Sequence, residues 1–225
     1  MKNLRLFLLS IAAGVCIGFG GLINLTCIAN ELKVLGGILF SVGLFLICVF
    51  GFKLFTGQVG YFFEKEDKFE FLKQLGIFYI GNLIGAVGFG YLLRLSTGLL
   101  DNTALDTAAI MVAEHKLIDL GNGVGQTWYS MLILAFFCGA LVFLAVDGFN
   151  NAKLHPFVRT LVLFVCVSIF VVCGFEHCIA DMFYLGFAGT FTSIRFPNAL
   201  VSILLGSTGN ILGAFATYFV VKIAK

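Results

Sequence analysis

The chain has 225 residues, of which 60% are hydrophobic and 12% are charged, and its formal net charge is +2 at pH 7. This composition excludes an ordinary soluble domain and provides no basic surface for nucleic acid, so we predict a polytopic protein of the lipid bilayer without a nucleic-acid partner. The seven cysteines lie in or beside apolar runs, which indicates packed hydrophobic side chains rather than a disulfide framework.

Apolar segments long enough to cross a bilayer, about 20 residues each, occur six times. They cover residues 6–29, 34–62, 74–95, 128–147, 158–191 and 198–223. The second and fifth are too long for plain spans, and each holds polar residues at an interior point. We therefore predict that both helices are broken where they line a cavity, because non-helical backbone at membrane depth must be buried in protein or wet.

Three ionisable side chains, Glu176, His177 and Asp181, lie near the middle of the fifth segment. A charge at the bilayer centre costs roughly 2.5–3.5 kcal/mol on insertion scales unless it faces a partner or a wet cavity. We therefore expect these residues to line a substrate path. The other histidines, His115 and His155, fall in predicted loops, and no carboxylate cluster completes a ligand shell, so we predict no metal and no cofactor.

Basic residues near the ends of the spans predict the orientation of the chain. Nine of the fourteen lie on one side, and they are Lys2, Arg5, Lys65, Lys68, Lys73, Lys153, Arg159, Lys222 and Lys225. The opposite side holds Lys33, Arg94, Lys116 and Arg195. We therefore predict a multi-pass protein of the inner or plasma membrane with both termini cytoplasmic. In the extracytoplasmic connector 96–127, an alanine-rich piece near 104–118 predicts a short helix lying on the surface.

Two short patterns recur in the same order in the two halves of the chain. The run GNLIGA at 81–86 returns as GNILGA at 209–214, and Gly51-Phe52 returns as Gly174-Phe175. With three spans per half, the second copy enters the membrane from the opposite face. We therefore predict one domain, 1–225, built from inverted repeats of about 1–95 and 128–225 whose broken helices face each other across a central site.

Three motifs resemble the formate/nitrite transporter family, and the resemblance covers nearly the whole chain. They are Leu54-Phe55-Thr56-Gly57, the GNLIGA run at 81–86, and the run GFEHCIADMF at 174–183. The resemblance implies an all-α, aquaporin-like protomer with six transmembrane helices and its own pore, assembled as a homopentamer. It also implies a channel, not an enzyme, for small monovalent weak-acid anions, with formate or nitrite expected first and hydrosulfide as the alternative.

By matching position, the resemblance assigns roles along the pore. It implies that His177 is the central histidine and that Thr56, on the loop that breaks the second helix, is its hydrogen-bonding partner. Leu54 and Phe55 belong to that loop, and a hydrophobic constriction is formed by Phe170 and Leu44. A basic residue, Lys153, is expected at a vestibule that attracts the anion.

The chain departs from the family pattern at three positions. Members commonly have an acidic residue where Lys53 stands, and an Asn where Asp181 and Gly139 stand. We hypothesise that Lys53 pairs with Asp181 or Glu176 and so ties the two broken helices together. The alternative is that each charge is solvated separately at the edge of a wet vestibule.

A histidine at an apolar constriction is compatible with two mechanisms. Because histidine titrates near neutral pH, it could protonate the anion as the anion loses its water. Hydrogen-bonded to a threonine, it could instead stay neutral while water supplies the proton. The sequence leaves both open, and the distant alternative is an intramembrane enzyme that uses Glu176, His177 and Asp181.

Overall fold

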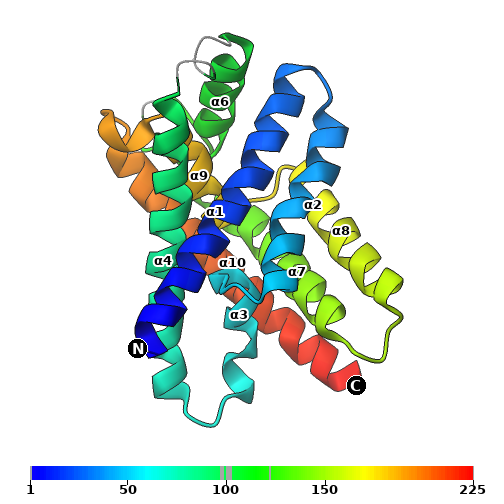
Figure 1. Ribbon diagram of the computed structural model, residues 1–225. Coiled ribbons are helices and arrows are strands. Elements are labelled where there is room, and N and C mark those ends of the chain that lie inside the picture. The colour runs from blue at the N-terminus through cyan, green and yellow to red at the C-terminus, as the bar shows by residue number, and fades with distance from the viewer. Residues whose placement is uncertain (1, 97–98, 100–102, 122, 225) are drawn as a thin grey trace.

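The computed structural model describes residues 2–96, 99, 103–121 and 123–224, which form a bundle of helices (Figure 1). The α-helices are α1 (Lys2–Ala29), α2 (Lys33–Phe50), α3 (Phe55–Val59), α4 (Lys68–Arg94), α6 (Thr103–His115), α7 (Trp128–Asn150), α8 (Pro156–Val172), α9 (Cys178–Phe187) and α10 (Phe196–Ala224). Two 3₁₀ turns, η1 (Gly60–Glu64) and η2 (Thr190–Thr192), follow α3 and α9.

Within the described residues, five helices, α1, α2, α4, α7 and α10, are long and apolar enough to cross a membrane. Helix α8 is also apolar but has 17 residues. The second and fifth predicted spans are each divided into two helices, α2 with α3 and α8 with α9. The all-α fold and the two breaks are therefore confirmed, and the count of six spans stays a prediction.

Both breaks have the same local backbone geometry. Gly51 ends α2 and Gly174 follows α8, with φ of 68° and 72°, a left-handed conformation that glycine adopts without steric cost. The residue after each glycine donates its N–H back into the last turn of the preceding helix. The chain is extended at Leu54 and His177, immediately before α3 and α9 begin.

An asparagine of α4 holds the first break in place. The Asn82 Oδ1 accepts the Phe55 N–H at 2.8 Å, so it satisfies a free donor at the start of α3. The Asn82 amide donates to the carbonyls of Ser10 at 2.8 Å and Lys53 at 2.9 Å. One buried side chain therefore joins α4, α1 and the non-helical segment.

Asn210 of α10 holds the second break in the same way. Its Oδ1 accepts the Cys178 N–H at 3.0 Å, and its amide donates to the carbonyls of Ala135 and Glu176, both at 2.8 Å. Asn82 and Asn210 are the asparagines of the recurring Gly-Asn motif. The sequence repeat therefore corresponds to a repeated hydrogen-bond pattern that fixes each broken helix to its neighbours.

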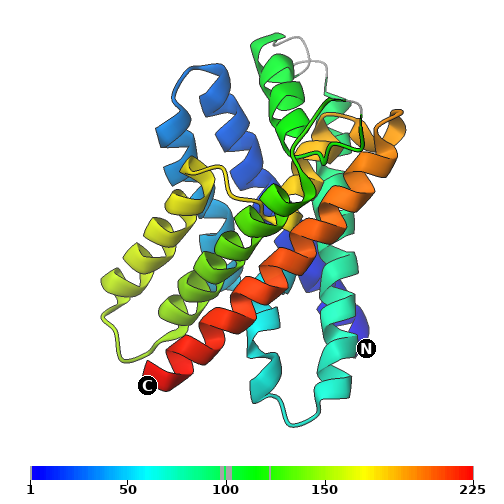
Figure 2. The ribbon, with the colours of Figure 1, turned by 180° about the vertical axis from the view of Figure 1, so that it is seen from behind.

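The second glycine of each recurring motif allows two helix pairs to pack closely. A Cβ added at Gly85 would overlap the carbonyl oxygen of Ile11, and one at Gly213 would overlap that of Phe136. Helix α4 therefore approaches α1, and α10 approaches α7, at backbone distance. Figure 2 shows α7 and α10 running side by side.

The ends of the bundle differ in what they carry. Both termini lie at one end, and α6 lies at the opposite end (Figure 1). The connector does contain the expected helix, but α6 packs against α1 and α9 and buries Leu105, Ala108, Ala109 and Ala113. The expectation of a helix lying on the surface is therefore wrong, because small alanines let one face pack into the protein. Connector positions 97–98, 100–102 and 122, and Lys225 of the tail, lie outside the described residues.

Replacing Asn210 with alanine is expected to destabilise the protein by about 2–3 kcal/mol, because the Cys178 N–H and the Glu176 carbonyl lose their partner in a buried site. Thermal unfolding in detergent measures the change. Thr208→Ala on the same helix is the control, since its hydroxyl is exposed and bonds only within α10. A loss at Asn210 no larger than at Thr208 would contradict the supporting role of the asparagine.

Candidate functional site

A buried polar pair joins the two broken helices. Thr56, in the first turn of α3, and His177, immediately before α9, are 1% and 2% exposed. Their Oγ1 and Nε2 atoms lie 2.8 Å apart, a hydrogen bond between residues 121 positions apart in the chain. The expected partnership of these two residues is therefore present in the structure.

The backbone around His177 selects one form of its ring. The Nδ1 atom accepts the Ala180 N–H at 3.2 Å and so caps α9. An atom that accepts a backbone N–H carries no proton, so the proton of the neutral ring is on Nε2. The Nε2–H then donates to the Thr56 hydroxyl oxygen, and the hydroxyl hydrogen of Thr56 points elsewhere.

Apolar side chains surround this pair. The Phe170 ring stacks on the His177 ring with centroids 5.7 Å apart, and Phe40 packs edge-on against Phe170 at 5.9 Å. Leu44, the other residue expected at the constriction, is buried in the same hydrophobic core, and so are Leu54 and Phe55, the residues expected on the loop of the first break. A solute at the polar pair would therefore be separated from bulk water.

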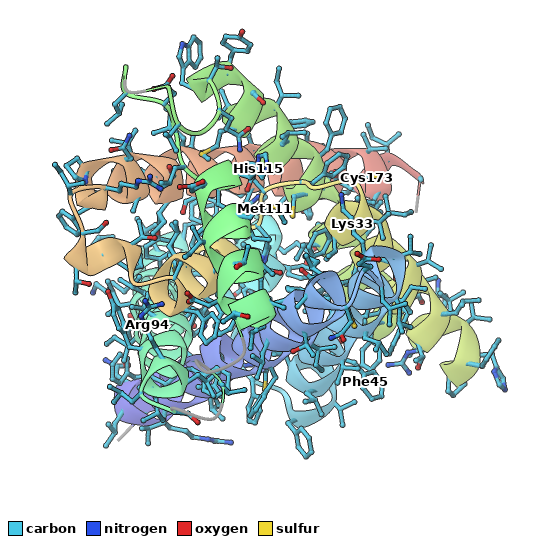
Figure 3. The ribbon with its side chains drawn as sticks, turned by 90° about the horizontal axis from the view of Figure 1, so that it is seen from above. Lys33, Phe45, Arg94, Met111, His115 and Cys173 are labelled. Atoms are coloured by element: carbon cyan, nitrogen blue, oxygen red, sulfur yellow. The ribbon has the colours of Figure 1, made fainter. Side chains whose placement is uncertain are left out.

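A cavity of about 360 Å³ opens beside His177 toward the α6 end of the bundle. Figure 3, which looks down from that end, shows α6 over the middle of the protein, with His115 at the end of this helix and Lys33 to one side of it. The polar and charged side chains that line the cavity are Asn24, Lys33, His115, Lys116, Gln126, Glu176, His177, Asp181 and Tyr184. We call this the α6-side cavity.

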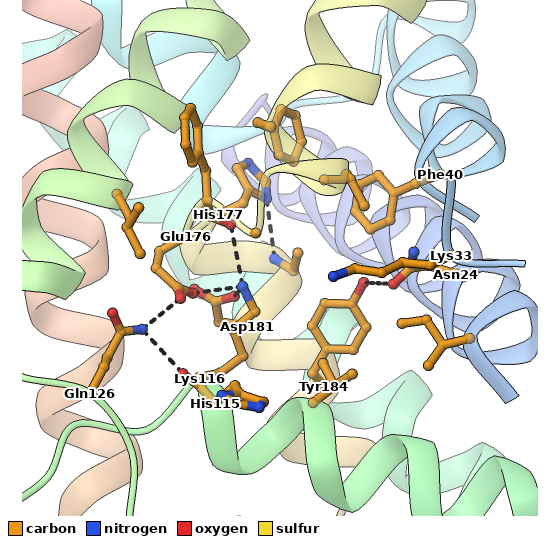
Figure 4. A pocket seen from close by; sticks show the side chains of 18 residues that line it. Asn24, Lys33, Phe40, His115, Lys116, Gln126, Glu176, His177, Asp181 and Tyr184 are labelled. Atoms are coloured by element: carbon orange, nitrogen blue, oxygen red, sulfur yellow. Dashed lines mark hydrogen bonds and ion pairs between the residues drawn. The ribbon is translucent and has the colours of Figure 1, made fainter. Parts of the chain in front are cut away.

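A lysine that follows α6 neutralises the buried glutamate. The Lys116 Nζ lies 2.8 Å from Glu176 Oε2 and 3.7 Å from Asp181 Oδ1, and it also donates to the Phe175 carbonyl at 3.2 Å (Figure 4). The other Glu176 oxygen accepts from the Gln126 side chain at 2.6 Å. Both oxygens of Glu176 are therefore occupied by donors.

The facing carboxylates determine the charge of Lys116. Burial lowers the pKa of Lys116, but the charges of Glu176 and Asp181 raise that pKa by more, so the net pKa lies above its ordinary value. The ammonium therefore remains charged at neutral pH. The sequence did not indicate Lys116 and Gln126 as site residues because both lie in the connector. There Lys116 served only to predict the orientation of the chain, and Gln126 belongs to no motif.

A second cavity of about 400 Å³ opens at the opposite end, where the termini lie. Its polar and charged lining comprises Lys53, Gln58, Lys65, Glu66, Asp67, Glu70 and Gln74. We call this the α3-side cavity. Thr56, Leu54 and Phe55 line neither cavity, so the polar pair lies between two hollows at opposite ends of the bundle.

The hypothesis that Lys53 pairs with Asp181 or Glu176 is wrong. Lys53 lines the α3-side cavity, both acids line the α6-side cavity, and Lys116 is the base beside them. The repeat explains the separation. The carbonyls of Lys53 and Glu176 accept from equivalent asparagines, so the two residues occupy matching positions of an inverted repeat and face opposite ends.

Lys153, the basic residue expected at a vestibule, lies in the loop between α7 and α8. Its side chain is exposed, and it lines neither of the two cavities. The loop is at the same end of the bundle as the termini (Figure 1). The role of Lys153 in attracting an anion therefore stays a prediction.

Comparisons with known proteins agree with this architecture. The model of the formate/nitrite transporter family matches residues 1–224. A probable formate transporter of Methanothermobacter thermautotrophicus is 29% identical over 93% of this chain and 84% of its own length. The formate channel FocA of Escherichia coli K12 is 31% identical over 80% of this chain, and the match spans 65% of the length of FocA, slightly less than two thirds.

A solved structure shares the whole fold. It is a pentameric formate channel with formate bound, and it superposes with a TM-score of 0.79 at 25% identity, covering 100% of this chain and 98% of that one. An ion channel of the same family gives a TM-score of 0.80 at 20% identity, covering 99% of this chain and 90% of that one. The full-length family match, together with the apolar helices, shows that this chain is a multi-pass membrane protein of the formate/nitrite transporter family.

Proposed function

We propose that the protein is a membrane channel for small monovalent weak acids, with formate or nitrite as the first candidates and hydrosulfide as the alternative. The observation that carries this proposal is the Thr56–His177 pair, a buried polar contact among apolar side chains between two cavities. Formate relatives and a formate-bound structural neighbour support the substrate class. The chemistry of the pair explains how such a solute crosses.

An anion cannot pass the apolar region without losing its hydration, which costs far more than moving the neutral acid. The neutral acid, however, still needs hydrogen bonds there. The Thr56 hydroxyl hydrogen can donate to the carbonyl-type oxygen of the solute while Nε2–H of His177 holds the hydroxyl in position. The pair therefore replaces part of the water that the solute gives up.

The capping bond favours one of the two proton routes. Protonating His177 at Nδ1 would break the bond from the Ala180 N–H and release the start of α9. The neutral ring keeps both of its hydrogen bonds. We therefore propose that His177 acts as a neutral donor and that the proton reaches the anion in the cavity, from water or from another acid.

We also propose the placement and assembly that the charge pattern and the relatives support. Both termini would face the cytoplasm, so the α3-side cavity would be the inner vestibule and the α6-side cavity the outer one. The formate-bound structural neighbour is pentameric, which supports a homopentamer here. In that assembly each protomer has its own pore.

Flux of the weak acid in liposomes tests the proposal. Proteoliposomes loaded with a pH dye are expected to acidify inside when formate is added outside, because the acid crosses neutral and releases its proton. The same assay with nitrite and hydrosulfide ranks the substrates. Rates equal to those of protein-free liposomes for all three solutes would reject the proposed function.

A further inference from the structure

Asp181 is a buried carboxyl group, and one of its oxygens receives no hydrogen bond from the part of the chain that the structure describes. The residue is 3% exposed and lines the α6-side cavity. Among the described residues no donor reaches its Oδ1, and the Lys116 ammonium lies 3.7 Å from that oxygen. A buried carboxylate without donors is unfavourable, so the state of this group needs a physical explanation.

The charges around the cavity suggest that explanation. Glu176 takes the short contact to Lys116 at 2.8 Å and a further donor from Gln126, so it is the acid whose ionised form is supported. If Asp181 were also ionised, two negative charges would share one buried positive charge. Like charges in one poorly hydrated site favour a state in which one of the two carboxyls holds a proton.

Apart from Lys116, which lies closer to Glu176 than to Asp181, the titratable groups in contact with Asp181 supply no positive charge among the described residues. Those close to it are Lys116, Glu176, Cys138, Cys178 and Tyr184. Across the cavity stand Lys33, His115 and His177, whereas α4 and α10 contribute no charged side chain to the described lining. Tyr184 donates its hydroxyl to Asn24 rather than to Asp181. Figure 4 shows Lys33 on the far side of the cavity from Glu176.

We propose that Asp181 carries a proton in the resting protein and delivers it to an anion that enters the α6-side cavity. This inference rests on the proposed function for its substrate. It names Asp181 as the acid that protonates the anion, a role that a neutral His177 does not fill. The Asp181 O–H bond breaks and a new O–H bond forms on the substrate anion, which becomes the neutral acid. The carboxylate left behind takes up a proton from a hydronium ion of the bulk solution, which becomes water, and the resting state is restored with one proton consumed for each anion.

The chemistry of the donor defines the substrate class. A carboxylic acid transfers its proton readily only to a base of similar strength. The desolvation that favours the protonated form of Asp181 also favours the protonated form of a small monocarboxylic anion in the same cavity, so the two become comparable there. Chloride, the anion of a strong acid, cannot accept that proton. We therefore expect formate-like carboxylates to be carried and chloride to be excluded.

Infrared spectroscopy of the protein in liposomes tests the resting state directly. A protonated carboxylic acid has a carbonyl stretch separate from that of carboxylates. At pH 7 we expect this band in the unmodified protein, and we expect it to shift when all aspartate carboxyls carry ¹³C. The band should be lost in Asp181→Asn and kept in Asp106→Asn, where the aspartate lies near Arg94 and outside the cavity.

Three spectroscopic results would each overturn the inference. They are the absence of a protonated-acid band, a band that does not shift with ¹³C-labelled aspartate, and a band that persists in Asp181→Asn. The labelling arm uses the unmodified protein, so it does not depend on how the variant folds. It also needs no transport, so it is separate from a failure of the proposed function.

Formate flux tests the delivery step. If the unmodified protein carries formate, Asp181→Asn should slow acidification at pH 7 by about tenfold, a modest part of the roughly 10²–10⁴-fold that a positioned acid contributes, because water in the cavity also supplies protons. Equal rates in the two proteins would refute delivery by Asp181 and leave the channel function intact. Chloride flux matching that of formate in the unmodified protein would also refute it.

Discussion

His177→Phe is expected to reduce weak-acid flux by about 100-fold or more while the protein stays folded. The substitution removes the Nε2–H that holds the Thr56 hydroxyl and leaves that hydroxyl among Phe170, Phe40 and the other buried apolar side chains. A polar solute crossing this region then loses hydrogen bonds that cost about 1–3 kcal/mol each when unmade. Two such losses raise the barrier by about 3 kcal/mol, or roughly 100-fold in rate.

The chain offers a matched control for this substitution. His155 caps α8 through its Nδ1, which accepts the Phe157 N–H at 3.3 Å, as His177 caps α9, but it is exposed and lines neither cavity. His155→Phe should therefore lose a similar helix cap, worth about 1 kcal/mol, with little change in flux. The acidification assay compares the two variants. Normal formate flux in His177→Phe, or an equal loss in His155→Phe, would contradict a pore role for His177.

The broken helices could be predicted because each break depends on a few neighbouring residues of the sequence. A glycine inside an apolar span, followed by polar residues, has few structural meanings in a membrane, and Gly51 and Gly174 both adopt the left-handed conformation that such a break favours. The recurring Gly-Asn pairs carried the second signal. Their spacing indicated a repeat, although the sequence did not show that Asn82 and Asn210 bind the backbone of the breaks.

The charge pairing could not be predicted, because an ion pair depends on which segments meet in space. Because Lys53 lies at a break, the sequence favours it as the partner of Glu176 or Asp181. The repeat is inverted, however, so Lys53 lines the α3-side cavity, whereas the two acids line the α6-side cavity. The buried carboxylate of Glu176 requires a base on its own side of the protein. The sequence offered Lys33, Arg94, Lys116 and Arg195 there, and only the packing of α6 against α1 and α9 selects Lys116.

The packing of α6 gives the connector a structural role. A helix on the surface could be removed with little effect on the pore. Instead, α6 buries its alanine face and ends directly before Lys116, so it sets the position of the ammonium relative to Glu176. A substitution that shifts α6 would therefore also shift the Lys116 ammonium and alter the charge balance of the α6-side cavity.

Replacing Lys116 is expected to cause a large loss of stability, because the buried Glu176 depends on this base for charge balance. Lys116→Met should lower the free energy of unfolding by about 3–5 kcal/mol, because it leaves the ionised Glu176 carboxylate in a buried site without its positive partner. The loss should shrink as the pH is lowered, since protonation removes the uncompensated negative charge. Thermal unfolding in detergent at several pH values measures both effects.

Two further variants separate loss of charge balance from loss of packing. Arg195→Met breaks the Arg195–Glu114 pair, whose side chains are 35% and 40% exposed, and it should cost no more than about 1 kcal/mol because solvent screens such pairs. Adding Glu176→Gln to Lys116→Met removes the stranded charge while keeping the shape of the side chain, so the double variant should be more stable than Lys116→Met alone. If the two changes add, or if Arg195→Met costs as much as Lys116→Met, the lysine does not balance the Glu176 carboxylate. If the double variant is more stable than Lys116→Met alone, the side chains of Lys116 and Glu176 are energetically coupled. The ammonium that α6 positions at the cavity then allows Glu176 to remain ionised inside the membrane.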